Sequence, residues 1–424
     1  MKHSLKSCFI IGLYLLCLSS YQSLSGQDWM GAQSDQWKVE QEVISLLEDE
    51  GFQNIAVRLD STTFQLTFEN RLYRFEPTAI RRIIELISRP LLNSEAENLV
   101  LLVQSQGVVL MSVELPVTAQ LFYDRSWALI GQQMKVELLP STQPSFSKKM
   151  VNNSGNYSFE LSVLPGLRLA LGGQPDPLAY ELDLRPRLTT YLWKGAKLKT
   201  ELILPISTEL NIAENKMVRP GLLAFQQFIR LPKNVLMSVS AGYFSDYRYG
   251  AEMEVGRFWL NGRLFLNARL GRTGYASYPI RLGLDEPEKG WQFSPLSYWN
   301  YYLGAAYRIP RWDLTVELSY AKALYNQQVV ELSCTRQFNE LDIGFFAYRT
   351  EEGDNYGFRL SVPIFPAKYF RPGRFHFRPA KHFEQRYQGS LHFASHYETG
   401  GDLRTYFKKL NPDFVKSQIS NRTQ

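Results

Sequence analysis

The residues best suited to chemistry are carboxylates that recur at every second position. Glu181 and Asp183 form one such pair, and Glu252 and Glu254 form another. Two carboxylates on either side of a sugar bond are the machinery of glycoside hydrolysis. The polar side of any alternating strand produces the same spacing, however, so the pairs indicate a strand face more than an active site. We therefore predict that the chain is not an enzyme and needs no cofactor.

The histidines do not form a recognisable metal site. Beyond the first ten residues, all of them lie near the C-terminus, at His376, His382, His392 and His396. A structural zinc site needs four ligands and a catalytic site three, usually at repeated short spacings that this segment lacks. The sequence also lacks the G-x-S-x-G, phosphate-loop and H-E-x-x-H motifs. We predict no bound metal.

Charged residues that face away from the apolar side of alternating segments are the candidate binding residues. If those segments are strands of a closed sheet, these side chains line its polar interior. Their mixed signs indicate a hydrogen-bonded interior or a narrow polar channel, with no selectivity ring of one sign. They are Glu181, Asp183, Arg185, Arg187, Lys199, Glu201, Glu252, Glu254, Arg263, Arg269, Asp313, Glu317 and Arg359.

The elements that position these residues are predicted by alternation with a period of two. Tyr157, Phe159 and Leu161 alternate with polar residues, and similar runs recur as far as Ile364. Each run has about the ~9–11 residues that a tilted transmembrane strand requires, or slightly more. Aromatic residues gather at the ends of the runs, as at Trp259, where the interfacial girdles of a membrane barrel lie.

The connections between these runs alternate in length. Outer-membrane barrels have short periplasmic turns and longer outer loops. We therefore predict a mainly β protein with a transmembrane antiparallel β-barrel of about twelve strands over residues 157–364 and both termini in the periplasm. A soluble β-sandwich is the alternative, although its strands are usually shorter, near ~5–6 residues. Short connections lie at 193–195, 232–233, 261–262, 309–311 and 338–340, and longer ones at 173–179, 207–220, 245–248, 274–296, 325–327 and 351–354.

The first 26 residues have the pattern of a secretory signal peptide. Lys2 and Lys6 precede the apolar run Cys8–Leu18. That run is followed by a stretch of small and polar residues that ends at Gly26. Cleavage at that point exports the chain to an oxidising compartment. The exported chain then keeps a single cysteine, Cys334, so it has no internal disulfide.

A small α/β domain is predicted over residues 36–117. A helix over 37–50 precedes a hairpin of Asn54–Leu59 and Thr63–Phe68. Pro77 then opens a second helix with an isoleucine stripe, and a second hairpin ends near residue 115. The order α-β-β-α-β-β fits two layers in the periplasm. Residues 118–156 are predicted to form a connector, because 141–156 are rich in Ser, Pro, Asn and Gly.

The charge of the chain is concentrated in residues 365–424. The formal net charge is +6, and this tail alone has eleven Lys or Arg against four Asp or Glu. Its interleaved aromatic residues are too many for a purely disordered tail. We predict that it packs in or under the barrel mouth and offers a cationic, aromatic surface to an acidic glycan or a periplasmic protein. The alternative is that its aromatics complete the barrel rim. A nucleic-acid partner is excluded for an exported chain with no nucleic-acid-binding motif.

Four segments resemble the YjbH/GfcD family: 51–57 (GFQNIAV), 68–74 (FENRLYR), the helix 77–87 and 248–255 (RYGAEMEV). That family comprises outer-membrane barrels of capsule and exopolysaccharide gene clusters, and members with two barrel modules are larger than this chain. The resemblance implies a protein of the Gram-negative outer membrane that assists polysaccharide secretion or assembly. Implied partners are outer-membrane lipid, polysaccharide and periplasmic export proteins. The alternative is a generic porin or a structural outer-membrane protein, since a fold does not fix a function.

Overall fold

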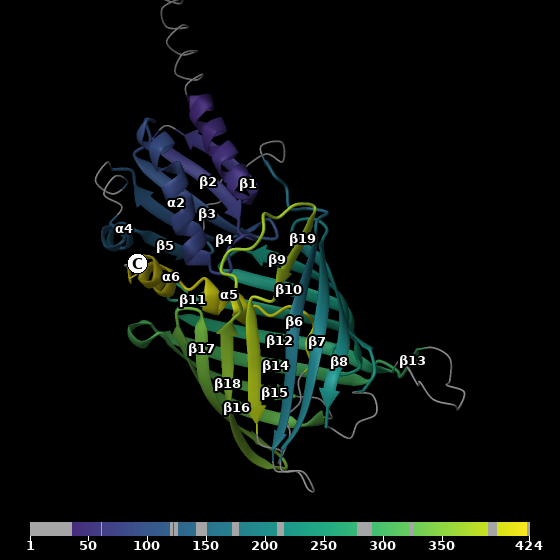
Figure 1. Ribbon diagram of the computed structural model, residues 1–424. Coiled ribbons are helices and arrows are strands. Elements are labelled where there is room, and N and C mark those ends of the chain that lie inside the picture. The colour runs from purple at the N-terminus through teal and green to yellow at the C-terminus, as the bar shows by residue number, and fades with distance from the viewer. Residues whose placement is uncertain are drawn as a thin grey trace, which may run out of the picture.

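A computed structural model of the chain divides into a small α/β unit and a large β-sheet (Figure 1). None of the described helices combines the length and apolarity that crossing a lipid bilayer requires. The signal-peptide prediction for residues 1–26 lies outside the described residues. Those residues are 36–60, 62–118, 122, 126–140, 151–171, 178–209, 216–277, 291–322, 326–388 and 397–421.

The small unit is a five-stranded sheet with helices packed on it. Its strand order is β1-β2-β3-β4-β5, in which β2 and β3 run parallel and the other neighbours run antiparallel. The predicted first hairpin and isoleucine stripe are confirmed. The elements are a helix over 36–50, β1 (Gln53–Asp60), β2 (Thr63–Glu69), α2 (Glu76–Leu92), β3 (Asn98–Ser105), β4 (Val108–Pro116), α4 (Trp127–Gln133) and β5 (Lys135–Leu138).

Helix α2 shows why these residues fold together. Pro77 stands in its first turn, where a missing N–H costs no hydrogen bond. Ile80, Ile83 and Ile87 recur at helical spacing, and all three are fully buried against the sheet. Burying one such side chain contributes roughly 1.5–3 kcal/mol. The small unit therefore has an ordinary apolar core.

The range 118–156, predicted as a connector, contains two of these elements. Strand β5 pairs with β4 through Val136 opposite Val113 and Leu138 opposite Met111. Both β5 side chains are buried. Four residues are too short a run for alternation to be recognised, which is why the sequence did not reveal this strand. Residues 141–150 lie outside the described part of the chain, and the predicted domain boundaries stay predictions.

The large sheet contains twelve consecutive long strands, each paired antiparallel with the next. They have 9 to 14 residues each, longer than usual for a sandwich. They are β6 (Phe159–Leu171), β7 (Leu178–Tyr191), β8 (Ala196–Thr208), β9 (Arg219–Leu231), β10 (Val235–Phe244), β11 (Arg248–Trp259), β12 (Leu264–Ser277), β14 (Tyr298–Ile309), β15 (Leu314–Lys322), β16 (Gln328–Phe338), β17 (Leu341–Thr350) and β18 (Gly353–Pro363), with β13 (Gln292–Phe293) paired to β12.

One C-terminal segment pairs with both outer strands of this series. Its first part, β19 (Phe375–Pro379), runs parallel to β6. Its second part, β20 (His382–Gln388), runs antiparallel to β18. In the described residues β6 and β18 do not pair directly, so a closed twelve-stranded barrel stays a prediction. We predicted that the strands end at Ile364 and that residues 365–424 lie outside the sheet. The alternation of β19 and β20 is short and is bounded by Pro372 and Pro379, so the sequence pattern did not reveal these strands.

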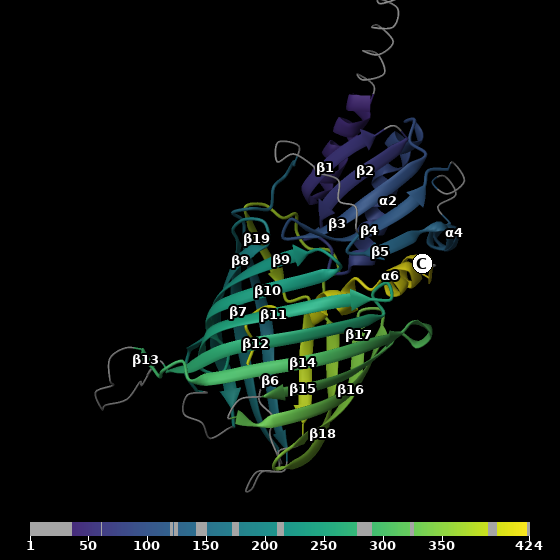
Figure 2. The ribbon, with the colours of Figure 1, turned by 180° about the vertical axis from the view of Figure 1, so that it is seen from behind.

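The large sheet curls around an interior. Strands β6, β7 and β8 lie on one side, and β9 to β15 cross on the other, as the two opposite views show (Figures 1 and 2). Helices α5 (Arg404–Lys409) and α6 (Pro412–Asn421), in yellow, lie between the sheet and the small unit. Arg81 of α2 donates to the backbone carbonyl of Ile419 at 2.7 Å. The C-terminal part therefore connects the two regions.

Candidate functional site

The large sheet has polar side chains inside and apolar side chains outside. Strand β16 alternates without interruption: Val330 and Leu332 are about half exposed, whereas Glu331 and Ser333 are buried. The alternation of pleated strands thus separates two faces of opposite character. Exposed apolar residues on the other strands include Leu184, Leu202, Leu223, Met253, Leu266, Leu270, Leu303, Leu318, Phe345 and Phe358, and buried polar ones include Glu160, Glu181, Asp183, Glu201, Gln226, Ser240, Glu252, Glu254, Asn267 and Glu317.

Ion pairs hold the interior faces of β7, β8 and β9 together. Glu181 accepts from Arg219 at 2.6 Å. On the same strand, Asp183 accepts from Arg185 at 2.6 Å. Arg187 and Glu201 join β7 to β8 at 2.6 Å. Breaking one partner of such a buried pair leaves an uncompensated charge, which costs about 3–5 kcal/mol.

The bridging segment of β19 and β20 adds two further carboxylate clusters. Glu160 of β6 accepts from Arg378 of β19 at 2.7 Å. Glu331 of β16 accepts from Arg386 of β20 at 2.7 Å and from Arg359 of β18 at 3.1 Å. Both arginines of the bridging segment therefore contact acidic residues on the inside of the sheet.

The C-terminal segment 397–407 lies along the opposite interior wall. The ring of Tyr397 stacks on Phe244 with 5.6 Å between centroids. Lys199 donates to the backbone carbonyl of Gly400. Phe407 stacks on Phe265 at 5.4 Å. We predicted that the whole tail, 365–424, packs in or under the barrel mouth. Residues 397–407 do pack against the inner side of the sheet, whereas β19 and β20 of the same tail are strands of the sheet itself. His392 and His396 lie outside the described residues.

Acidic residues of β11 and β15 receive donors from this segment. Glu254 accepts the backbone N–H of Leu403 at 3.0 Å. Glu252 accepts the hydroxyl of Thr399 at 3.4 Å. Glu317 accepts Arg404 at 3.2 Å. The C-terminal segment thus supplies neutral hydrogen-bond donors to Glu252 and Glu254 and a cation to Glu317.

Arg404 is the central cation of this contact. Its Nε bonds both carboxylate oxygens of Asp402, at 3.0 and 3.2 Å, and its guanidinium lies 5.4 Å from the ring centroid of Tyr302. Burial acts to raise the pKa of Asp402, but Arg404 and Arg269 outweigh burial and hold that pKa below its ordinary value. Asp402 therefore stays ionised inside the molecule.

Eleven of the thirteen sequence-predicted site residues lie on the inner side of the sheet. Arg263 and Asp313 do not, because each stands at the edge of a turn where the alternation ends. Arg263 is exposed and pairs with Asp413 of α6 at 2.7 Å. Asp313, with a left-handed φ of 48°, accepts Arg308 at 2.9 Å. A binding role for the other eleven stays a prediction.

Sequence reasoning missed two of the largest buried cations. The side chain of Arg308 is fully buried and Arg248 is 1% exposed. Arg248 lies 3.7 Å from the ring centroid of Tyr275 and donates to its hydroxyl at 2.7 Å. Both stand close to a strand end, beyond the central runs of alternation. Both arginines can be assigned to strands if the alternating runs are extended by one or two residues toward their aromatic ends.

The carboxylate pairs form hydrogen bonds and ion pairs with neighbouring residues of the fold. Asp183 is bidentate to Arg185, and Glu254 accepts from Asn267 and Leu403. In the part of the chain that the structure describes, no group of three or more His, Cys, Asp or Glu could hold a metal ion. The arrangement is a polar, cross-braced lining, and the absence of enzymatic activity stays a prediction.

The fold and this lining define a mainly β protein whose large antiparallel sheet exposes its apolar face. The family model "Exopolysaccharide biosynthesis protein YbjH" (YjbH) matches residues 22–235, 214 of the 424 residues. The chain belongs to the YjbH exopolysaccharide-biosynthesis family. No curated protein matches it.

Two solved structures are similar over part of the chain. Both are of OmpT, an outer membrane protein of Vibrio cholerae. The variant lacking loop L8 has a TM-score of 0.24 and 9% identity, and covers 48% of this chain and 85% of its own. The in-vitro folded form has a TM-score of 0.25 and 9% identity, and covers 48% and 80%.

Proposed function

We propose that the protein is a non-enzymatic outer-membrane β-barrel that assists exopolysaccharide or capsule secretion or assembly. The observation that carries this proposal is the outward apolar face of the large sheet, combined with membership of an exopolysaccharide family. Soluble monomers rarely expose apolar patches above a few hundred Å², and larger ones mark membrane or protein contacts. A polar interior behind an apolar outer band is the arrangement of membrane barrels.

The ends of the strand series support a barrel with a periplasmic domain. Strand β6 begins and β18 ends beside the small unit: Arg71 bonds Ser158, and Arg74 bonds the carbonyl of Ile364. Twelve up-and-down strands return the chain to the side from which it started. In this proposal β19 and β20 close the remaining gap, and the small unit with the C-terminus lies in the periplasm, where the short turns of barrels are found.

Exposed aromatic residues at strand ends support a membrane position. Trp193, Trp259 and Trp312 stand near the small unit, and Trp299 stands at the other end; each is 43–54% exposed. Indoles favour the headgroup level of a bilayer because one part of the ring system is apolar and its N–H is polar.

The rival function is that of a generic porin or structural outer-membrane protein. The segment 397–407 argues against an open porin, because it occupies part of the interior and binds Glu254 and Glu317. A partly occupied interior fits a protein that contacts polysaccharide or periplasmic export proteins at its mouth better than one that passes solutes freely.

The test is gene deletion with measurement of exported polysaccharide. We expect export to fall, and to return when the gene is supplied in trans. Unchanged export in the deletion strain refutes the role in secretion. Outer-membrane fractionation and gel mobility before and after boiling test the barrel separately, because closed barrels resist detergent until heated. Recovery in the soluble periplasm refutes the barrel.

A further inference from the structure

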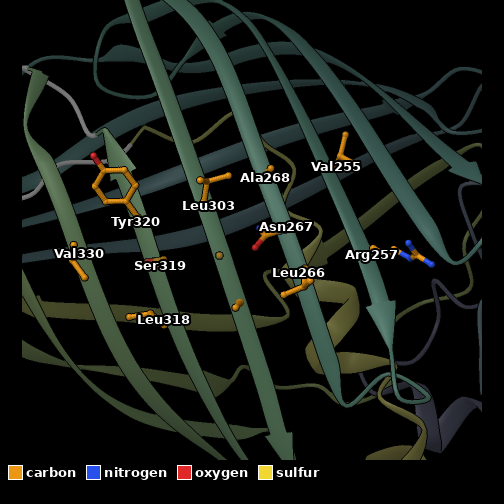
Figure 3. Close-up of a pocket in the computed structure, with 12 residues that line it drawn as sticks. Val255, Arg257, Leu266, Asn267, Ala268, Leu303, Leu318, Ser319, Tyr320 and Val330 are labelled. Carbon is orange, nitrogen blue, oxygen red and sulfur yellow. The ribbon is translucent and has the colours of Figure 1, made fainter.

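The outer face of the large sheet is hollowed across β11, β12, β14, β15 and β16 (Figure 3). The hollow has a volume of about 570 Å³, within the ~300–1,000 Å³ range of small-molecule sites. Residues from five neighbouring strands line it, so it crosses the strands rather than following one of them. Its walls are Leu266, Leu303, Leu318, Tyr320 and Val330.

The hollow exists because two alanines on the outer face are surrounded by longer side chains. Ala268 of β12 lies beside Leu303 in the register, and Ala305 of β14 lies between Leu266 and Leu318. Each alanine ends at its Cβ, so the neighbouring leucines form the rims. The resulting surface is an apolar groove that faces outward.

One cation lines this groove, at the end next to the small unit. Arg257 points away from the apolar part of the groove, on the side of the C-terminal helices (Figure 3). Its guanidinium lies 3.9 Å from the ring centroid of Trp259. The guanidinium carries a positive charge at the edge of an apolar face, and such a charge offers a site for an anion.

We infer that this groove binds a membrane glycerophospholipid, with its phosphate at Arg257 and an acyl chain across Leu303 and Leu318. The inference rests on the proposed membrane position. The arginine and the indole of Trp259 mark headgroup level at the end of the sheet near the small unit, and the apolar walls continue from there toward the middle of the strands. Phosphate matches the fork of donors on a guanidinium.

A second copy of the chain fits this groove less well. No Asp or Glu lines it. A twofold contact between two identical grooves would therefore bring Arg257 toward its own copy with no acid to pair with, because a twofold interface places the same patch on both sides.

A neighbouring pair supplies a matched control. Arg336 of β16 also lies over an aromatic ring, with 4.7 Å to the centroid of Phe338. It too stands on the exposed side of its strand, near the turn that contains Glu340, whose carboxylate pairs with Arg74 of the small unit. Arg336 does not line the groove. Neutralising Arg336 removes one positive charge from the outer face, as neutralising Arg257 does, but leaves the residues of the groove unchanged.

The test is native mass spectrometry of the full chain purified in detergent and titrated with phosphatidylglycerol. We expect Arg257→Gln to weaken binding by about tenfold, the effect of losing one charge-assisted contact, and Arg336→Gln to leave it unchanged. Ala305→Trp fills the groove and should also abolish binding, whereas Ala347→Trp, on the exposed side of β17 away from the groove, should not. Glycerol 3-phosphate, the headgroup without chains, should bind far more weakly than the lipid.

Several outcomes overturn the inference. Equal loss in Arg257→Gln and Arg336→Gln shows non-specific attraction to the cationic rim. Equal binding of glycerol 3-phosphate and phospholipid shows a phosphate site without an acyl groove. A dimeric mass that Ala305→Trp abolishes and lipid does not alter makes the groove a subunit contact. If the unmutated protein and all variants shift in mobility on boiling but none of them binds lipid, the barrel is supported and only the lipid site is refuted. Absence of the mobility shift in the unmutated protein refutes the proposed function itself.

Discussion

The two regions of this molecule bury opposite kinds of side chain. In the small unit Phe52, Phe64 and Phe68 are fully buried, and charged groups lie mostly outside. In the large sheet Phe345 is 67% exposed while Glu181 is fully buried. Water stabilises the first arrangement through the hydrophobic effect. The second is the arrangement expected for a sheet whose outer face meets an apolar solvent, as it does in the membrane position that we propose.

The change from an apolar to a polar interior takes place where the two regions meet. Phe228, Phe258 and Phe265 of the large sheet turn inward near the small unit and join the same apolar cluster as Phe407 and Leu410. The inside of the sheet is thus most apolar at the end where the small unit and the C-terminal helices cover it. Farther along the strands the described interior is mainly polar, with smaller buried apolar clusters such as Val329, Phe346 and Tyr348.

The largest expected effect comes from truncation, because it removes pairing that only the large sheet needs. A chain ending at Pro366 lacks both β19 and β20, and we expect it to lose the gel mobility shift on boiling. A chain ending at Gln388 keeps both strands and loses only 389–424, and we expect the shift to remain. If the shorter chain still shows the shift, the bridging segment is dispensable and the strands close without it.

Alanine substitutions at phenylalanine compare the two kinds of burial directly. We expect Phe68→Ala to lower the free energy of unfolding by about 3–5 kcal/mol, because it opens a cavity in a close-packed core. Phe345→Ala should cost below about 1 kcal/mol in micelles, where the side chain touches detergent. Urea unfolding of the purified variants measures both. Equal losses at the two sites contradict an outward-facing Phe345.

Lysine substitutions probe the solvent of the outer face. Leu332→Lys should reduce outer-membrane assembly and cost about 2–4 kcal/mol, the effect of a charge near the middle of a bilayer. Thr62→Lys, at an exposed turn of the small unit, should change stability by no more than about 0.5 kcal/mol. Fractionation and folding yield are the measurements. Normal assembly of Leu332→Lys places that face in water.

The pH dependence of stability separates two acids of the small unit. Burial opposes ionisation of Glu50, but Arg82, Lys368 and Tyr73 lower its pKa to about 2. Its folded pKa lies below the unfolded value, so its stabilisation is present above about pH 4.5 and is lost as the pH falls toward 2. Glu50→Gln should therefore be less stable than the unmutated chain at pH 7, and the difference should vanish near pH 2. Acid titration of urea midpoints measures it.

Glu76 is the control, because its pKa is shifted in the opposite direction from that of Glu50. Burial raises its pKa to about 7, with hydrogen bonding from Asn70 opposing the rise. A raised folded pKa gives stability that is present below about pH 4.5 and lost as the pH rises through 7. Glu76→Gln should thus be relatively stabilising at pH 8 and neutral at pH 4. The same direction for both variants at pH 8 contradicts this assignment.

A small effect is also expected at Arg263, which we predicted to be an interior residue and which lies outside. Its exposed pair with Asp413 should contribute no more than about 1 kcal/mol. Arg404→Ala leaves Glu317 and Asp402 without their cation and should cost several times more, about 3–5 kcal/mol. Urea midpoints of the two variants compare them, and equal effects would show that the interior is hydrated like the surface.

Alternation was enough to predict most of the large sheet from the sequence. With a period of two, one apolar residue such as Leu182 assigns its neighbours Glu181 and Asp183 to the opposite face. The prediction failed where the period ends, at Arg263 and Asp313, because turn residues no longer follow the pleat. It also failed for β5 and β19, since four or five residues give too little periodicity.

The partners of the interior charges could not be predicted. Glu160 meets Arg378 only because β19 pairs with β6, and Glu317 meets Arg404 only because the C-terminal segment enters the sheet. Pairing between segments that are distant in sequence depends on topology, which local patterns do not contain. The excess of basic residues after residue 365 was the one sequence signal of this arrangement.

The position of β19 also bears on the order in which the chain can assemble. Glu160 and Arg378 are 218 residues apart in sequence, yet they lie on neighbouring strands. Contacts across such separations form slowly. Until the last part of the chain is present, β6 keeps an edge of unpaired backbone groups, which is a template for aggregation. If the chain is exported as we propose, the first long strand therefore needs to be shielded, for instance by a chaperone, until the end of the chain arrives.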